Sequence, residues 1–222
     1  MLPVLVLPAA GAGSRFGGDI PKQLVRLAGI PVLRRSLDAF AGLVSEAVVP
    51  VASDGREAVA AALEGSRVRV RLVPGGTTRQ ASVHAGLLAT DPDCALVLVH
   101  DAVRPLVPRA CIAACIAALA LHDAALVAIP CPDTVKRAND GRVATTVPRD
   151  DLWLAQTPQG FRRASGLAAF ARAESEGWTC SDDAQVLERA GFSVAVVQGD
   201  RRNFKITTPD DLAVAAALLT SG

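Results

Sequence analysis

The fold of this chain is decided by the stretch Leu2-Pro3-Val4-Leu5-Val6-Leu7-Pro8-Ala9-Ala10-Gly11-Ala12-Gly13-Ser14-Arg15-Phe16-Gly17-Gly18-Asp19-Ile20-Pro21-Lys22-Gln23. An apolar run of strand length leads directly into a loop that holds four glycines and two cations. Glycines let backbone N–H groups approach a ligand closely, and successive exposed N–H groups form a concave anion site. Arg15 adds a planar charged fork and Lys22 a point charge. The stretch therefore predicts a strand followed by a polyphosphate-binding loop.

The glycine spacing differs from that of the two common nucleotide loops. Gly11, Gly13 and Gly17 miss the dinucleotide-binding fingerprint by one residue, and the G-x-x-x-x-G-K-[ST] phosphate loop is absent. An ordinary strand-to-helix turn explains the glycines equally well. The cations on either side of the loop, Arg15 and Lys22, favour phosphate binding.

Composition predicts one α/β domain. The chain has 222 residues, half of them apolar, and a formal net charge of +1. The near-neutral charge argues against a nucleic-acid-binding groove. The longest apolar run, residues 110–121, is shorter than the roughly 20 residues that cross a bilayer, and we expect neither a membrane partner nor a secretory signal. Five scattered cysteines are typical of reduced thiols, which predicts a cytoplasmic protein.

A second glycine loop, Pro74-Gly75-Gly76-Thr77-Thr78-Arg79, follows a predicted strand over residues 68–73 and precedes a predicted helix. Helix N-termini bind anions through their unpaired N–H groups. An ordinary turn with a solvent-exposed arginine is the alternative. If this loop lies at a neighbouring strand end, it forms the second wall of one pocket.

A third signal is the apolar run of residues 95–99 followed by His100-Asp101-Ala102-Val103-Arg104. Five apolar residues predict a central strand that is buried on both faces. Asp101 then lies at the carboxyl end of the sheet, where open α/β folds bind ligands, and could help to hold Mg²⁺ on a triphosphate. Alternatively, Asp101 caps the next turn and pairs with Arg104. We interpret His100 as structural, since it faces away from Asp101.

The character of the sequence changes over residues 131–150. Two short extended runs flank Asn139-Asp140-Gly141, which is typical of a β-hairpin turn. A two-stranded ribbon is marginally stable alone, so we expect this arm to pack on a second subunit.

These motifs resemble, in order over residues 8–212, the 2-C-methyl-D-erythritol 4-phosphate cytidylyltransferase family. The resemblance is carried by A-A-G-x-G-x-R with P-K-Q, G-G-x-x-R-x-x-S, V-H-D-A-x-R-P, P-D-T-V-K-R-A, P-R-D-D-L-W, W-x-x-Q-T-P-Q, S-D-D and N-x-K-I-T-x-P. It implies a Rossmann-like doubly wound, mostly parallel sheet with a protruding β-arm, one nucleotidyltransferase domain over residues 1–222 and a homodimer formed through the arm. It also implies transfer of CMP from CTP to 2-C-methyl-D-erythritol 4-phosphate, with release of pyrophosphate, in the non-mevalonate route to isoprenoid precursors.

The resemblance also assigns site residues. The implied catalytic residues are Arg15, Lys22 and Lys205. The implied nucleotide-binding residues are Ala9, Ala10, Gly11, Gly13, Gly75, Gly76, Arg79, Ser82, Asp101 and Ala102. The implied acceptor-binding residues are Arg104, Thr157 and Lys205, with Thr134 and Arg149 reaching into the neighbouring chain's site. Mg²⁺ or another divalent cation is expected mainly on the CTP phosphates, with Asp101 as a possible ligand.

Two alternatives stay open from the residues alone. One is a cytidylyltransferase for another polyol phosphate such as ribitol 5-phosphate. The combination of Thr134, Arg149 and Thr157 favours methylerythritol phosphate over such an acceptor. The other is a non-catalytic nucleotide-binding protein, which we expect to lack at least one of the three catalytic cations. One departure from the family pattern is Ser14, where some relatives carry a second basic residue, and we expect it to weaken triphosphate binding.

Overall fold

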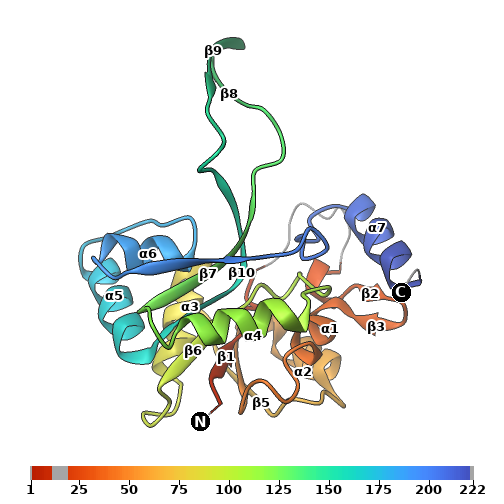
Figure 1. The fold of residues 1–222 in the computed structure, drawn as a ribbon. Coiled ribbons are helices and arrows are strands. Elements are labelled where there is room, and N and C mark those ends of the chain that lie inside the picture. The colour runs from red at the N-terminus through yellow and green to blue at the C-terminus, as the bar shows by residue number, and fades with distance from the viewer. Residues whose placement is uncertain (1, 12–19, 221–222) are drawn as a thin grey trace.

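The computed structural model describes residues 2–11 and 20–220 and contains a central seven-stranded sheet in the order β11-β7-β10-β6-β1-β4-β5 (Figure 1). The pairs β11–β7, β6–β1, β1–β4 and β4–β5 are parallel, whereas β10 runs antiparallel to both of its neighbours. This confirms the predicted mostly parallel sheet. The strands are β1 (Val4–Val6), β4 (Ala47–Val51), β5 (Val70–Pro74), β6 (Leu96–Val99), β7 (Ala124–Pro130), β10 (Trp153–Arg162) and β11 (Val194–Gln198).

Helices cover both faces of this sheet because the central strands are apolar on both sides. In β1, Leu5 belongs to one buried cluster, while Val4 and Val6 belong to the other. The first cluster is completed by α1 (Val32–Asp38), α2 (Arg56–Leu63) and α4 (Arg109–Ala118). The second is completed by α3 (Arg79–Leu88), α5 (Arg163–Ser175) and α6 (Asp183–Arg189). This arrangement is the doubly wound fold that the sequence predicts.

A third, smaller core fastens the C-terminal segment to the carboxyl end of the sheet. One member is Leu27, which lies in a ribbon formed by β2 (Arg26–Leu27) and β3 (Ile30–Pro31). The others include Val103, Ile206, and Ala215, the last of which lies in α7 (Pro209–Thr220). The backbone N–H of Ile206 donates to the Val103 carbonyl at 2.9 Å. Lys205 is thereby held beside the turn that follows β6.

Side chains cap the N-termini of α3 and α6. The Asp182 carboxylate accepts a hydrogen bond from the Gln185 N–H at 2.9 Å and so caps α6. The helix α1 begins at Val32, because Ile30 and Pro31 before it pair with β2. Within residues 2–11 and 20–220, none of the helices has both the length and the apolar character needed to cross a membrane.

The hairpin arm projects away from the body of the molecule (Figure 1). It consists of β8 (Val135–Asn139) and β9 (Arg142–Val147), in which every residue except the half-buried Val135 and Val147 is exposed. Asp140 and Gly141 take φ values of 49° and 75°, the left-handed conformation that a tight hairpin turn requires. The predicted hairpin is therefore confirmed, and its surface is almost entirely uncovered in the single chain.

Candidate active site

A cavity of about 320 Å³ lies where β1, β5 and β6 end. Its position at the carboxyl edge of parallel strands is the one that ligands occupy in open α/β sheets. The first loop, the second glycine loop, the turn after β6 and the C-terminal segment all contribute to its wall. The lining residues are Pro8, Ala9, Ala10, Gly11, Lys22, Gln23, Gly76, Thr77, Thr78, Arg79, Asp101, Ala102, Val103 and Lys205.

Gln23 fixes the shape of the first loop from inside. This side chain is 6% exposed, and its amide nitrogen donates to the carbonyls of Ala9 at 3.2 Å and Gly11 at 3.0 Å. Lys22 lies next to it in a short 3-10 turn and lines the cavity. The predicted residues Gly13 and Arg15 fall outside the described residues, as does Ser14.

The second loop approaches the first so closely that only glycine fits at position 75. A β-carbon at Gly75 would lie 2.7 Å from the β-carbon of Ala10. The Ser82 hydroxyl accepts from the Gly76 N–H at 3.1 Å and donates to the Thr78 carbonyl at 2.9 Å. Ser82 is 2% exposed, so its hydroxyl shapes the loop from behind while Gly76 and Thr78 line the cavity.

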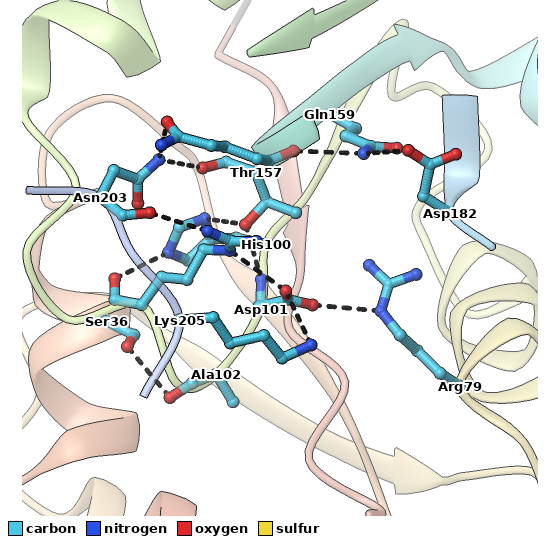
Figure 2. A network of polar contacts seen from close by, with 12 residues as sticks. Ser36, Arg79, His100, Asp101, Ala102, Thr157, Gln159, Asp182, Asn203 and Lys205 are labelled. Carbon is cyan, nitrogen blue, oxygen red and sulfur yellow. Dashed lines mark hydrogen bonds and ion pairs between the residues drawn. The ribbon is translucent and has the colours of Figure 1, made fainter. Parts of the chain in front are cut away.

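Three cations surround the carboxylate of Asp101 (Figure 2). The Nε of Arg79 lies 3.1 Å from Oδ1, and the Nε of Arg104 and the Nζ of Lys205 each lie 3.2 Å from Oδ2. Burial by itself raises the pKa of this carboxyl, but the three cations outweigh burial and hold the pKa below its ordinary value. Asp101 is therefore ionised at neutral pH and holds cations from three separate segments of the chain.

Arg79 has a second acidic partner, Asp183, at the start of α6. Its two terminal nitrogens contact the two oxygens of Asp183 at 3.0 and 2.8 Å, and the Asp183 side chain is 1% exposed. Gln159 on β10 orients this helix, because its amide donates to Asp182 at 3.0 Å and accepts from the Ala184 N–H at 2.7 Å (Figure 2). The guanidinium is thus held in one orientation at the cavity wall.

His100 and Thr157 lie behind the turn that carries Asp101. His100 is fully buried, its Nε2 lies 3.1 Å from the Arg104 carbonyl, and its Nδ1 lies 2.9 Å from the Thr157 hydroxyl. That hydroxyl also accepts from the Asp101 N–H at 3.0 Å. Burial lowers the pKa of His100 to about 4, although the Arg104 carbonyl opposes the shift. His100 is structural, as the sequence predicts, whereas the Thr157 hydroxyl faces inward and Thr157 does not line the cavity.

A second hollow of about 390 Å³ lies beside the first, at the base of the arm. Lys205 lines both hollows, and Arg104 and Arg201 line the second together with apolar side chains such as Leu154. Thr134 and Arg149, which the sequence assigns to acceptor binding, are exposed at the base of the arm and line neither hollow of their own chain. The Arg149 guanidinium instead contacts the Pro132 carbonyl.

Among the described residues, five cations face two carboxylates around the two hollows. The cations are Lys22, Arg79, Arg104, Arg201 and Lys205, and the carboxylates are Asp101 and Asp183. This excess of positive charge at the end of a parallel sheet suits the binding of anionic ligands. Sequence reasoning did not select Gln23 or Asp183 as site residues, although each lies in a quoted motif, P-K-Q and S-D-D respectively.

Comparison with known proteins identifies the family. The sequence pattern of the 2-C-methyl-D-erythritol 4-phosphate cytidylyltransferase family matches residues 3–221. The chain belongs to this family. A cytidylyltransferase of that name from Deinococcus radiodurans is 46% identical over 213 residues, which cover 96% of this chain and 88% of the relative.

Solved structures of the family share the fold. The 4-diphosphocytidyl-2C-methyl-D-erythritol synthase of Anaerococcus prevotii superposes with a TM-score of 0.86 at 32% identity, covering 99% of this chain and 98% of its own. The 2-C-methyl-D-erythritol 4-phosphate cytidylyltransferase of Thermus thermophilus superposes with a TM-score of 0.85 at 35% identity. The match covers 99% of this chain and 100% of that structure's chain. The chain is therefore a nucleotidyltransferase that shares the domain of these relatives.

Proposed function

We propose that the two joined hollows bind the two substrates of the family reaction, CTP in the first and 2-C-methyl-D-erythritol 4-phosphate in the second. The chain transfers CMP from CTP to this acceptor and gives 4-diphosphocytidyl-2-C-methyl-D-erythritol and pyrophosphate. The observation that carries the assignment is Lys205, which lines both hollows and pairs with Asp101 between them. Its ammonium is placed to neutralise charge on both reactants.

The reaction needs no nucleophile from the protein. An oxygen of the acceptor phosphate attacks the α-phosphorus of CTP, a new P–O bond forms, and the bond to the leaving pyrophosphate breaks. Both reactants are anions, so the site must hold them in line and neutralise their mutual repulsion. We assign this role to Lys22 and Lys205, and to Arg15 in the part of the first loop that lies outside the described residues.

The nucleotide and the acceptor are bound from different segments. The close contact of Gly75 with Ala10 supports a base and ribose site between the two glycine loops, walled by Gly76 and Arg79. Arg104 supports an acceptor-phosphate site in the second hollow. Ser82 and Thr157 contribute from behind these walls, and the further nucleotide contacts that we propose are Ala9, Ala10, Gly11 and Ala102.

We also propose that Mg²⁺ accompanies CTP. In the part of the chain that the structure describes, Asp101 is the carboxylate that lines the first hollow, and both of its oxygens are already engaged by cations. Among residues 2–11 and 20–220, no cluster of three acidic, His or Cys side chains could hold a metal. This donor set fits an ion held mainly by phosphate oxygens, with Asp101 as a protein ligand. The ion would shield charge on the triphosphate.

The exposed arm supports a homodimer. A ribbon with almost no covered surface gains stability only against another surface, and Thr134 and Arg149 at its base do not reach the hollows of their own chain. We propose that they reach the acceptor site of the partner. The free cysteines at buried and half-buried positions support a reducing compartment, the cytoplasm.

The activity is tested by mixing the protein with Mg²⁺, each of the four nucleoside triphosphates in turn, and either 2-C-methyl-D-erythritol 4-phosphate or ribitol 5-phosphate. We expect pyrophosphate release with CTP and the methylerythritol phosphate. Release only with ribitol 5-phosphate would favour the other polyol, and CTP binding without release would favour a non-catalytic protein.

The shared site is tested by mixing two inactive variants, Lys205→Ala and Arg149→Ala. Each homodimer then lacks one half of every site. A hybrid dimer contains one site built from the intact body of one chain and the intact arm of the other. Random exchange should therefore restore about a quarter of wild-type activity for a two-fold dimer. No recovery, with exchange shown by mass spectrometry of tagged chains, would refute the arm exchange.

A further inference from the structure

The Thr157 hydroxyl and the His100 ring form a chain of hydrogen bonds whose direction is fixed by chemistry. A carbonyl oxygen can only accept, so His100 Nε2 carries a proton and donates to Arg104 at 3.1 Å. In the neutral ring Nδ1 is then an acceptor, which requires the Thr157 hydroxyl to donate to it at 2.9 Å. The lone pairs of that hydroxyl remain for the Asp101 N–H at 3.0 Å.

This chain begins and ends on the same turn. Asp101 donates at its start and the Arg104 carbonyl accepts at its end, and the turn between them is closed by the Arg104 N–H, which donates to the Asp101 carbonyl at 3.1 Å. Both inner members are buried, Thr157 at 3% and His100 at 0% exposure, so water does not replace a lost partner. Figure 2 shows His100 and Thr157 together above Asp101, on the side away from Lys205.

Asn203 ties the same strand end to the C-terminal segment. Its amide nitrogen donates to the Thr157 carbonyl at 2.7 Å, and its backbone carbonyl accepts from the Arg104 guanidinium at 2.7 Å. Lys205 follows two residues later. The segments that carry Asp101, Arg104 and Lys205 are therefore joined through Thr157.

We propose that Thr157 and His100 are positioning residues for the acceptor side of the site: the Thr157 hydroxyl, acting through His100 and the Asp101 N–H, fixes the turn that presents Asp101 and Arg104. This replaces the direct substrate contact predicted for Thr157. The inference rests on the proposed function, because the acceptor site is defined there. Asp101 also lines the nucleotide hollow and pairs with Arg79 at 3.1 Å, so loss of the Thr157 hydroxyl should affect both substrates.

The test compares Thr157→Val, which keeps the shape and removes the hydroxyl, with Thr157→Ser, which keeps the hydroxyl. We expect kcat/KM for the acceptor to fall about tenfold or more in the valine variant, since a buried N–H and a buried ring nitrogen lose their partner. The serine variant should recover most of the activity. A folded valine variant with unchanged acceptor kinetics, or an equally impaired serine variant, would overturn the proposal.

A spectroscopic measurement tests the direction of the hydrogen bonds at His100 independently of turnover. Nitrogen-15 NMR of wild-type His100 should show a proton on Nε2 and an unprotonated, hydrogen-bonded Nδ1, whose shift moves in the valine variant. A proton on Nδ1 in the wild type would overturn the proposal even if the valine variant does not fold. Wild-type protein that lacks pyrophosphate release but shows the expected ring signature would refute the proposed function and leave the hydrogen-bond chain intact.

Discussion

Arg79 and Asp183 form a two-pronged ion pair between the first turn of α3 and the start of α6, with nitrogen–oxygen distances of 3.0 and 2.8 Å. Burial and ion pairing shift the pKa values of both partners in opposite directions. Burial lowers the pKa of Arg79, but Asp183 and Asp101 outweigh it and raise that pKa above its ordinary value. Asp183 therefore holds the Arg79 guanidinium in one orientation beside Asp101 at the cavity wall.

Removing the charge of Asp183 should release Arg79. We expect Asp183→Asn to cost about 3 kcal/mol of unfolding free energy, the low end for a broken buried pair, because Arg79 is partly exposed. The KM for CTP should rise, since Arg79 lines the nucleotide hollow. Urea unfolding and kinetics of Asp183→Asn, Arg79→Gln and the double variant measure the coupling, and additive effects would contradict this pair.

Lys22 should act on turnover and not on folding. We expect Lys22→Ala to lower kcat at least about 100-fold, the effect of losing one positioned charge worth about 3 kcal/mol at the transition state. Arg26→Ala is the matched control, because this nearby cation is exposed, lies outside both hollows and donates to the Gly29 carbonyl. Near-normal turnover of Lys22→Ala at saturating substrates would remove Lys22 from catalysis.

Gly75 should tolerate no side chain. In Gly75→Ala the new β-carbon would meet Ala10 at 2.7 Å and the Val51 carbonyl at 3.3 Å, so the two loops must separate. We expect a stability loss of about 1–3 kcal/mol and weaker CTP binding. Gly55→Ala is the control, since its β-carbon would meet nothing within 4 Å. Calorimetric titration with CTP compares them, and equal affinities would show that the contact is unimportant.

Buried His100 should make stability depend on pH. Its pKa is about 4 in the folded protein and about 6.5 when exposed, so the unfolded chain binds more protons between these values. Stability is therefore lost as pH falls from 6.5 towards 4, by up to about 1.4 kcal/mol per pH unit from this group. Asp101, Arg104 and Arg79 are the charged groups that influence the ring.

His100→Gln should flatten this dependence. Urea unfolding of both proteins at intervals between about pH 4.5 and 7, the range bracketed by the two pKa values, gives the two slopes under identical conditions. The other titrating groups are shared and cancel in the comparison. Parallel slopes would mean that His100 is not the group responsible.

Cys115 should resist alkylation while the protein is folded. It is fully buried, and burial raises the pKa of its thiol to about 12, so almost none is thiolate at about pH 8. Half-buried Cys131 and Cys180 should react first with iodoacetamide. Peptide mass spectrometry of native and urea-treated protein measures this order, and early labelling of Cys115 in the native state would contradict its burial.

The sequence by itself determined the alternation of strands and helices, the hairpin turn at Asp140 and Gly141, and the placement of Asp101 after a buried strand. These are local properties, since periodicity, glycine φ preferences and turn chemistry act over a few residues. It also determined the family, because the motifs are contiguous strings. The short ribbon at residues 30–31 escaped prediction, because its partner strand is equally short and weak in pattern.

Only the tertiary structure decided which groups meet. Nothing in the spacing of Arg79, Asp101, Asp183 and Lys205 specifies that one carboxylate collects cations from three segments, since that depends on strand order and on the packing of α6 and the C-terminal segment. The same holds for Thr157, whose hydroxyl could face a substrate or the interior. Its direction follows from the antiparallel course of β10 beside β6, which aims it at His100.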